Sequence, residues 1–303
     1  MIVRPRLQAG PSRENRDKRE QQERKKMKDR ITIDVQDGVA DVRLIRTDKM
    51  NALDDAMFAA LIEAGQTVAA DPSIRAVVLS GEGRAFCAGL DMGNFGRMAE
   101  TPKAESERET TASDVTEGLA SRTHGISNRA QYAVWTWREA PVPVIAAVHG
   151  VAFGGGFQLM LGADIRIVHP DTKLSVMEIK WGLIPDMAGT AIMRSLVRDD
   201  VVRELTYTGR QFSGTEAQAL GFATLLSEDP RARALEMARE IAGKNPDAIS
   251  AAKKIFNSAA DASDADLLMQ ESVLQAQIIR TPNQVEAVLS TMEKRPGQFK
   301  NRA

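Results

Sequence analysis

Residues 144–158 read VIAAVHGVAFGGGFQ: a short apolar run, a break at His149-Gly150, and three glycines before a stretch with helical spacing. Glycines that open a helix leave unpaired backbone N–H groups at the positive end of its dipole. Such groups suit an anion, either a phosphate or a developing oxyanion. No Gly-Lys-Ser/Thr follows and the dinucleotide fingerprint is absent, so neither a P-loop nor a Rossmann site is predicted. The glycines can equally serve tight packing of the helix on a sheet, and both roles can hold together.

The segments around this stretch alternate between strand and helix patterns, which favours an α/β fold. Asp37-Gly38 between two alternating runs indicates a β-hairpin. Predicted strands are Ile31–Val35, Val39–Ile45, Ile74–Leu79, Val144–Val148, Ile165–Val168 and Lys173–Val176, and predicted helices are Asp54–Ala70, Ile126–Arg138 and Gly155–Leu161.

The sequence pattern divides the chain into three regions. Residues 93–125 are polar and lack periodicity, so we interpret them as an excursion that could cover a site. The last quarter is mostly helical, strongest over Pro230–Ala242, Pro246–Ala259, Ala265–Arg280 and Pro282–Lys294. We therefore predict a charged, disordered leader over residues 1–27, an α/β core over 28–227, and a helical region over 228–303.

Composition narrows the functional class. Apolar residues make up 43% and charged residues 27% of 303 residues, as in soluble globular proteins, and no apolar run is long enough for a membrane span. One cysteine, Cys87, allows no internal disulfide, which fits a cytoplasmic location. The first 30 residues carry a formal charge of +6 and the rest −7, so we interpret the leader as a solvated tail. Nucleic-acid binding by this basic segment is a weaker alternative.

Two further stretches could carry chemistry. Gly83–Asp91 follows a predicted buried strand, and its small residues would let a ligand approach the backbone; a plain tight turn is the alternative. Glu178 and Asp186 lie among large apolar residues, where desolvation raises a carboxyl pKa towards the range of general acid–base catalysis. Either acid could instead be an ordinary surface or paired carboxylate.

These stretches occur in the order and spacing of the crotonase (enoyl-CoA hydratase/isomerase) superfamily. Arg46-Thr47-Asp48-Lys49-Met50-Asn51-Ala52-Leu53 resembles its early Arg-Pro…Asn-Ala-Leu segment, with Thr47 in place of proline. Ala85–Asp91 resembles its first oxyanion-hole loop, and Val144–Gly156 its second. The resemblance runs from about Ile31 to Phe299 and implies a spiral of ββα units with a C-terminal helical region, usually assembled as a homotrimer or a dimer of trimers.

The resemblance also implies roles for single residues. The N–H groups of Ala88 and Gly155 would form the oxyanion hole for an acyl-CoA thioester, with no metal and no tightly bound cofactor, because coenzyme A belongs to the substrate. Glu178 matches a catalytic acid of the family. The residues expected to contact the substrate are Lys49, Met50, Ala52, Leu53, Gly89, Leu90, Asp91 and Gly154.

This chain departs from the hydratase pattern at two positions. Hydratases of the family carry a second glutamate where Gln158 stands, and an amide cannot exchange a proton as a carboxyl does, although it can position a water. Asp186 lies eight residues after Glu178, a spacing that resembles the dienoyl-CoA isomerases, although these also have an Asp at the position of Gln158. Double-bond isomerisation is therefore preferred over 2-enoyl-CoA hydration or non-catalytic acyl-CoA binding.

Other reactive or aromatic side chains receive plainer interpretations. Cys87 has no evident base partner and is expected to be a small buried hydrophobe. The three histidines are too scattered for a metal site. Tryptophans 135, 137 and 181 are expected to pack, and Phe153, Phe157 and Trp181 are candidates for an acyl pocket.

Overall fold

The computed structural model describes residues 25–27, 29–93 and 119–303, so most of the predicted leader and of the predicted 93–125 excursion lies outside the described residues. The strands are β1 (Lys25–Met27), β2 (Ile31–Gln36), β3 (Val39–Leu44), β4 (Ala76–Gly81), β5 (Val144–Val148), β6 (Val151–Phe153), β7 (Ile165–Val168), β8 (Lys173–Ser175), β9 (Phe212–Ser213) and β10 (Leu225–Leu226). The last three residues of the predicted leader form β1, which pairs antiparallel with β2.

The helices fall into a group around the sheets and a C-terminal group. The first group is α2 (Asp55–Ala70), α5 (Arg129–Glu139), α6 (Gly155–Leu161), α7 (Gly189–Met193), α8 (Asp199–Thr208), α9 (Gly214–Leu220) and α10 (Pro230–Ala242), with the 3-10 helices η1 (Thr47–Lys49) and η2 (Met177–Trp181). The second is α11 (Pro246–Ser258), α12 (Asp264–Ile278) and α13 (Pro282–Met292).

The strands form two sheets, and the chain passes from one to the other and back. The larger has the order β1-β2-β3-β4-β5-β7-β10 and is parallel from β3 to β10, whereas the smaller has the order β6-β8-β9. Consecutive strands go to different sheets, β5 and β7 to the larger and β6 and β8 to the smaller, with α6 between the two pairs. This arrangement is the predicted spiral of ββα units.

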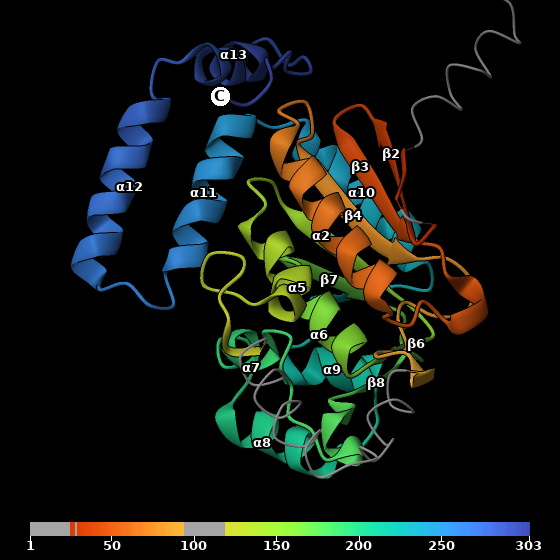
Figure 1. Ribbon diagram of the computed structural model, residues 1–303. Coiled ribbons are helices and arrows are strands. Elements are labelled where there is room, and N and C mark those ends of the chain that lie inside the picture. The colour runs from red at the N-terminus through yellow and green to blue at the C-terminus, as the bar shows by residue number, and fades with distance from the viewer. Residues whose placement is uncertain (1–24, 28, 94–118) are drawn as a thin grey trace, which may run out of the picture.

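Buried side chains form a core on both faces of the larger sheet, which lies between α2 and α10 (Figure 1). On one face α2 packs against α5, and Gly65 permits the contact, because a Cβ there would lie 2.3 Å from the hydroxyl oxygen of Thr136. On the other face α10 buries Ala234, Ala238 and Ala242 against β3, β4, β5 and β7. Although α10 falls within the predicted C-terminal region, it belongs to this core.

Helices α11 to α13 extend beyond the sheets (Figure 1). Buried Lys253 attaches α11 to the core, because its ammonium donates to the carbonyls of Trp137 and Val142 and to the carboxylate of Asp164. In contrast, α12 buries none of its side chains and contacts α11. No helix within residues 25–27, 29–93 and 119–303 is long and apolar enough to cross a membrane.

Candidate active site

The loop after β4 runs between two neighbouring chain segments that fix the directions of its amides. On one side, Cys87 donates to Val151 and accepts from Phe153, which joins the loop to β6. On the other side, Leu53 donates to the carbonyl of Gly89 and accepts from the amide of Asp91. The loop is therefore held along both edges.

The Ala88 amide donates to the carbonyl oxygen of Met50 at 2.9 Å. The prediction that this N–H forms the oxyanion hole is therefore wrong, because it already has an acceptor within the protein. The amide that remains is two residues later. Since Gly89 and Asp91 both bond to Leu53, the N–H of Leu90 between them points to the opposite side.

Gly155 is the first residue of α6, and its N–H is one of those that a helix start leaves without an intrahelical acceptor. Neither this amide nor that of Leu90 meets an acceptor in the part of the chain that the structure describes. The two loops also touch, because a Cβ placed on Gly89 would lie 3.7 Å from the Gly155 nitrogen. Two amides without acceptors, one from each loop, can together stabilise an oxyanion.

The predicted acid Glu178 lies in η2, and only 8% of the residue is exposed. Its Oε1 accepts from Nε2 of Gln158 at 2.6 Å, and its Oε2 is buried with no hydrogen-bond partner among the described residues. Desolvation by burial is the largest effect on its pKa, followed in the same direction by the charge of Asp186; the net result is a raised pKa.

Asp186 lies near enough to Glu178 for its charge to act on that carboxyl. It is exposed to solvent, although the surrounding protein removes enough of its hydration to raise its pKa as well. The structure therefore brings both predicted acids together, and each is biased towards the protonated form. Acids with raised pKa values are suited to exchanging protons near neutral pH.

Gln158 is fully buried and uses its amide oxygen for two backbone donors, Met187 at 2.8 Å and Gly189 at 2.9 Å. Both lone pairs of this oxygen are therefore occupied, and it cannot itself accept from a water.

The predicted substrate segment at residues 49–53 is anchored from within. Asn51 is fully buried and its amide donates to the carbonyls of Glu82 and Ala85. Lys49 is exposed, whereas the side chain of Leu53 is fully buried, with Cδ1 2.8 Å from where a Cβ on Gly155 would be. Leu53 therefore packs beneath the start of α6 and bonds to the loop after β4.

Sequence reasoning missed Arg46 and the Leu90 amide. Arg46 donates to the carbonyl of Ala52 at 2.9 Å and pairs with Asp91 at 2.6 Å, so it ties the two loops together. Its place at the head of the Arg46–Leu53 segment was the available signal. Leu90 was named only as a substrate contact, because the direction of a backbone N–H depends on which segment the loop pairs with, and a sequence does not show that pairing.

Several plainer interpretations can be checked. Cys87 is buried, and burial raises the pKa of its thiol to about 12, as expected of an unreactive core residue. The candidacy of Phe157 for an acyl pocket is wrong, because it packs in the core edge-on against Phe212 and Phe222. Trp137 is buried as predicted. No group of three potential metal ligands occurs within the described residues.

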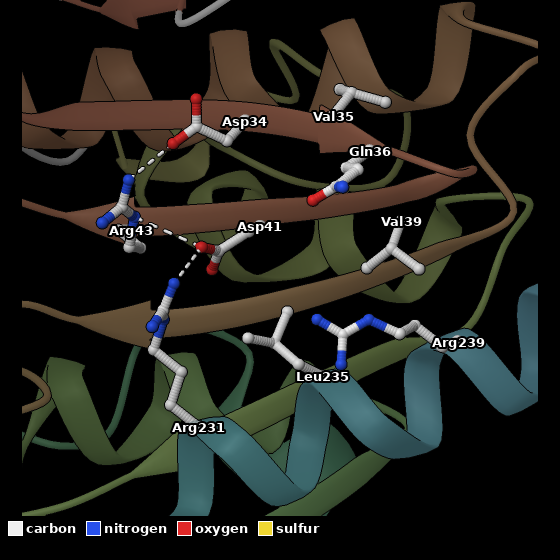
Figure 2. A pocket seen from close by; sticks show the side chains of 9 residues that line it. All are labelled: Asp34, Val35, Gln36, Val39, Asp41, Arg43, Arg231, Leu235 and Arg239. Atoms are coloured by element: carbon white, nitrogen blue, oxygen red, sulfur yellow. Dashed lines mark hydrogen bonds and ion pairs between the residues drawn. The ribbon is translucent and has the colours of Figure 1, made fainter. Parts of the chain in front are cut away.

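A cavity of about 470 Å³ lies elsewhere, between the β2–β3 hairpin and α10 (Figure 2). It is lined by Asp34, Val35, Gln36, Val39, Asp41, Arg43, Arg231, Leu235 and Arg239. Arg43 pairs there with Asp34 and Asp41, and Arg231 joins Asp41 from α10. None of the residues predicted for catalysis lines it, and its ion pairs connect the hairpin to α10.

A family model described as enoyl-CoA hydratase/isomerase matches residues 34–302. Similar proteins include the mitochondrial methylglutaconyl-CoA hydratase of Mus musculus, 27% identical over 87% of this chain and 80% of that protein. The mitochondrial Delta(3,5)-Delta(2,4)-dienoyl-CoA isomerase of the same organism is 28% identical over 86% of this chain and 78% of its own. The crystal structure of an enoyl-CoA hydratase from Mycobacterium smegmatis superposes with a TM-score of 0.73 at 28% identity, over 89% of this chain and 98% of that one. The spiral of ββα units, the paired amides and the match over nearly the whole chain agree: this chain is a member of the enoyl-CoA hydratase/isomerase family, whose enzymes are lyases and isomerases.

Proposed function

We propose that this enzyme moves a double bond along the acyl chain of an enoyl- or dienoyl-CoA through a thioester enolate. The observation that carries the proposal is that Asp186 lies near enough to Glu178 for its charge to act on that carboxyl, at a site where Gln158 replaces a second glutamate and has its amide oxygen occupied by two backbone donors. The two acids that can exchange protons there are thus Glu178 and Asp186.

The thioester oxygen would accept from the N–H groups of Leu90 and Gly155. When a proton leaves the acyl chain, negative charge moves onto this oxygen, and one such donor stabilises it by about 3–4 kcal/mol. The amide of Leu90 takes the place that the sequence assigned to Ala88. No bound cofactor takes part, since coenzyme A is a portion of the substrate.

The proton transfers follow from the state of each acid. Glu178 takes a proton from one carbon through Oε2, the oxygen that lacks a partner among the described residues. Asp186 in its protonated form gives a proton to a carbon further along, and desolvation by the surrounding protein favours that form because it raises the pKa of Asp186. One proton is removed and one is added, so the double bond shifts with no change in composition. Solvent access to Asp186 then lets the two acids reset.

The test offers purified protein 2-enoyl-, 3-enoyl- and 3,5-dienoyl-CoA and follows ultraviolet absorbance. Isomerisation should be the main reaction of the wild-type protein. Asp186→Asn should lower the isomerisation rate at least about 100-fold and leave CoA-ester binding unchanged. Isomerisation that persists at the wild-type rate in this variant would refute the role of Asp186.

Hydration of a 2-enoyl-CoA with Glu178 as the main acid and base is the second candidate. The similarity to the methylglutaconyl-CoA hydratase supports it as the similarity to the dienoyl-CoA isomerase supports the first. Incorporation of labelled water oxygen separates the two, because isomerisation adds no oxygen. Binding without turnover of any substrate would favour a non-catalytic acyl-CoA-binding protein.

The C-terminal helices support assembly as a homotrimer or a dimer of trimers. Large apolar side chains are exposed along them, including Phe256 at 74%, Met269 at 64% and Met292 at 76%. Such a surface is larger than single scattered apolar residues explain. Light scattering on the full chain measures the mass directly, and a monomer at micromolar concentration would exclude this proposal.

A further inference from the structure

One side chain, that of Gln158 in α6, connects the turn that carries Glu178 with the segment that follows Asp186. Its Nε2 donates to Oε1 of Glu178 at 2.6 Å, and its Oε1 accepts from the amides of Met187 and Gly189. The side chain is fully buried, so these bonds form away from bulk water.

The two backbone donors determine which way the amide faces. If the Gln158 amide were turned over, its NH2 group would meet the N–H groups of Met187 and Gly189, leaving buried donors without acceptors. The NH2 group must therefore face Glu178. It occupies Oε1 of that carboxylate, and Oε2 is left as the oxygen with no hydrogen-bond partner among residues that the structure describes.

The same bonds fix the path of the chain just after Asp186. Met187 and Gly189 flank Ala188, a non-glycine residue with a positive φ of 69°. At Gly189 the contact with Gln158 leaves no room for a side chain, since a Cβ would lie 2.6 Å from Oε1. A strained residue persists where its surroundings hold it on both sides, and Gln158 supplies that constraint.

We propose that Gln158 is a positioning residue that sets the two acids of this site relative to each other. It presents Oε2 of Glu178 as the oxygen that exchanges protons, and it anchors the segment that carries Asp186. This inference rests on the proposed function, in which these two acids move the proton.

A neutral amide suits this task better than a carboxyl. An amide donates at every pH, whereas a carboxyl 2.6 Å from Glu178 would donate only while protonated and would repel Glu178 once ionised. No nearby cation competes with Gln158 for the Glu178 carboxyl among the described residues. Among the described residues, Asp186 is the one whose charge acts on Glu178, Lys180 lies over the ring of Trp181, and Arg210 is paired with Glu204 and Glu216.

Two substitutions separate the tasks of Gln158. Gln158→Met keeps the size and loses all three bonds, so kcat should fall about 100-fold at every pH, with KM nearly unchanged because the side chain does not touch substrate. Gln158→Glu keeps an acceptor for Met187 and Gly189, so it should fold and stay active at mildly acidic pH. Its kcat should fall on the alkaline side, where the introduced carboxyl ionises and stops donating. Met160→Leu, a buried change on the same helix, is the packing control and should match wild type.

Two kinetic results would contradict a positioning role for Gln158. Wild-type kcat in Gln158→Met, or an alkaline limb in Gln158→Glu no steeper than in wild type, would overturn the proposal. Infrared titration of the Glu178 carboxyl, identified by its loss in Glu178→Gln, tests it without turnover. Loss of the Gln158 donor should move that titration to higher pH, because the hydrogen bond favours the ionised form. An unmoved titration would refute positioning by Gln158, whereas a shifted titration in an enzyme with no isomerase activity would refute the proposed function alone.

Discussion

Nη1 of Arg46 lies 2.6 Å from Oδ2 of Asp91, and this ion pair joins the segment before Leu53 to the loop that carries the Leu90 amide. Arg46 also holds the carbonyl of Ala52. The position of the Leu90 amide therefore depends on a charged side chain whose ion-pair partners are Asp54 and Asp91, not Glu178 or Asp186.

Arg46→Met should lower kcat/KM by about 10–100-fold, because the loop would lose its tie to the neighbouring segment and the amide would shift. Steady-state kinetics with an enoyl-CoA measures this. Arg43→Met is the matched control: Arg43 is similarly enclosed and ion-paired, but its partners are Asp34 and Asp41 in the hairpin and Glu82 at the start of the loop, eight residues before Leu90. Equal losses in both variants would argue against a specific role of Arg46.

Gly155→Ala should reduce kcat by about 100-fold or more through displacement of its amide. The added methyl would lie 2.7 Å from Sδ of Met187 and 2.8 Å from Cδ1 of Leu53, so either the neighbours or the start of α6 must move. Gly243→Ala, where the nearest atom is 3.4 Å away, should leave kinetics unchanged. Normal turnover in Gly155→Ala would contradict the oxyanion role.

The pH dependence should carry the mark of Glu178. Its pKa is raised above 4.5 by burial, so kcat/KM should increase with pH through a pKa above that value as the base becomes ionised. The sign for stability is opposite, because an acid with a raised pKa in the folded state destabilises the fold as pH rises through that pKa. Glu178→Gln should therefore be inactive but unfold at a higher temperature than wild type at alkaline pH, with little difference at acidic pH. A lower unfolding temperature at alkaline pH would contradict this assignment.

Lys253→Met should cost about 2–4 kcal/mol of unfolding free energy, because two buried carbonyls and part of a carboxylate lose their donor. The ammonium holds Trp137, Val142 and Asp164 together, although burial lowers its pKa. Chemical denaturation measures the loss. Lys254→Met, at the exposed neighbouring position, should stay within experimental error of wild type.

Much of the fold could be predicted from local patterns. The limits of Val144–Val148, Gly155–Leu161 and Ile165–Val168 agree with β5, α6 and β7, because each combines an apolar run with a clear break. The hairpin was also predictable, since Asp37 and Gly38 both adopt the positive φ of its turn.

Elements stabilised by distant pairing were missed. Strand β6 is three residues long and pairs with β8 some twenty residues later, so the glycines around it masked the strand. The role of Gln158 escaped for the same reason, since its partners are twenty to thirty-one residues away. The two acids could be named from the sequence, but not the side chain that orients one of them.

The parallel bridge between Leu53 and Leu90 has a consequence for how this protein can change. At Leu90 the direction of the main-chain donor is set by hydrogen bonds of Gly89 and Asp91 to the neighbouring segment, so it does not depend on which side chain stands at position 90, whereas an exchange at Glu178 or Asp186 removes the carboxyl itself. The backbone at Leu90 can therefore keep its place while the side chains at positions 158, 178 and 186 differ.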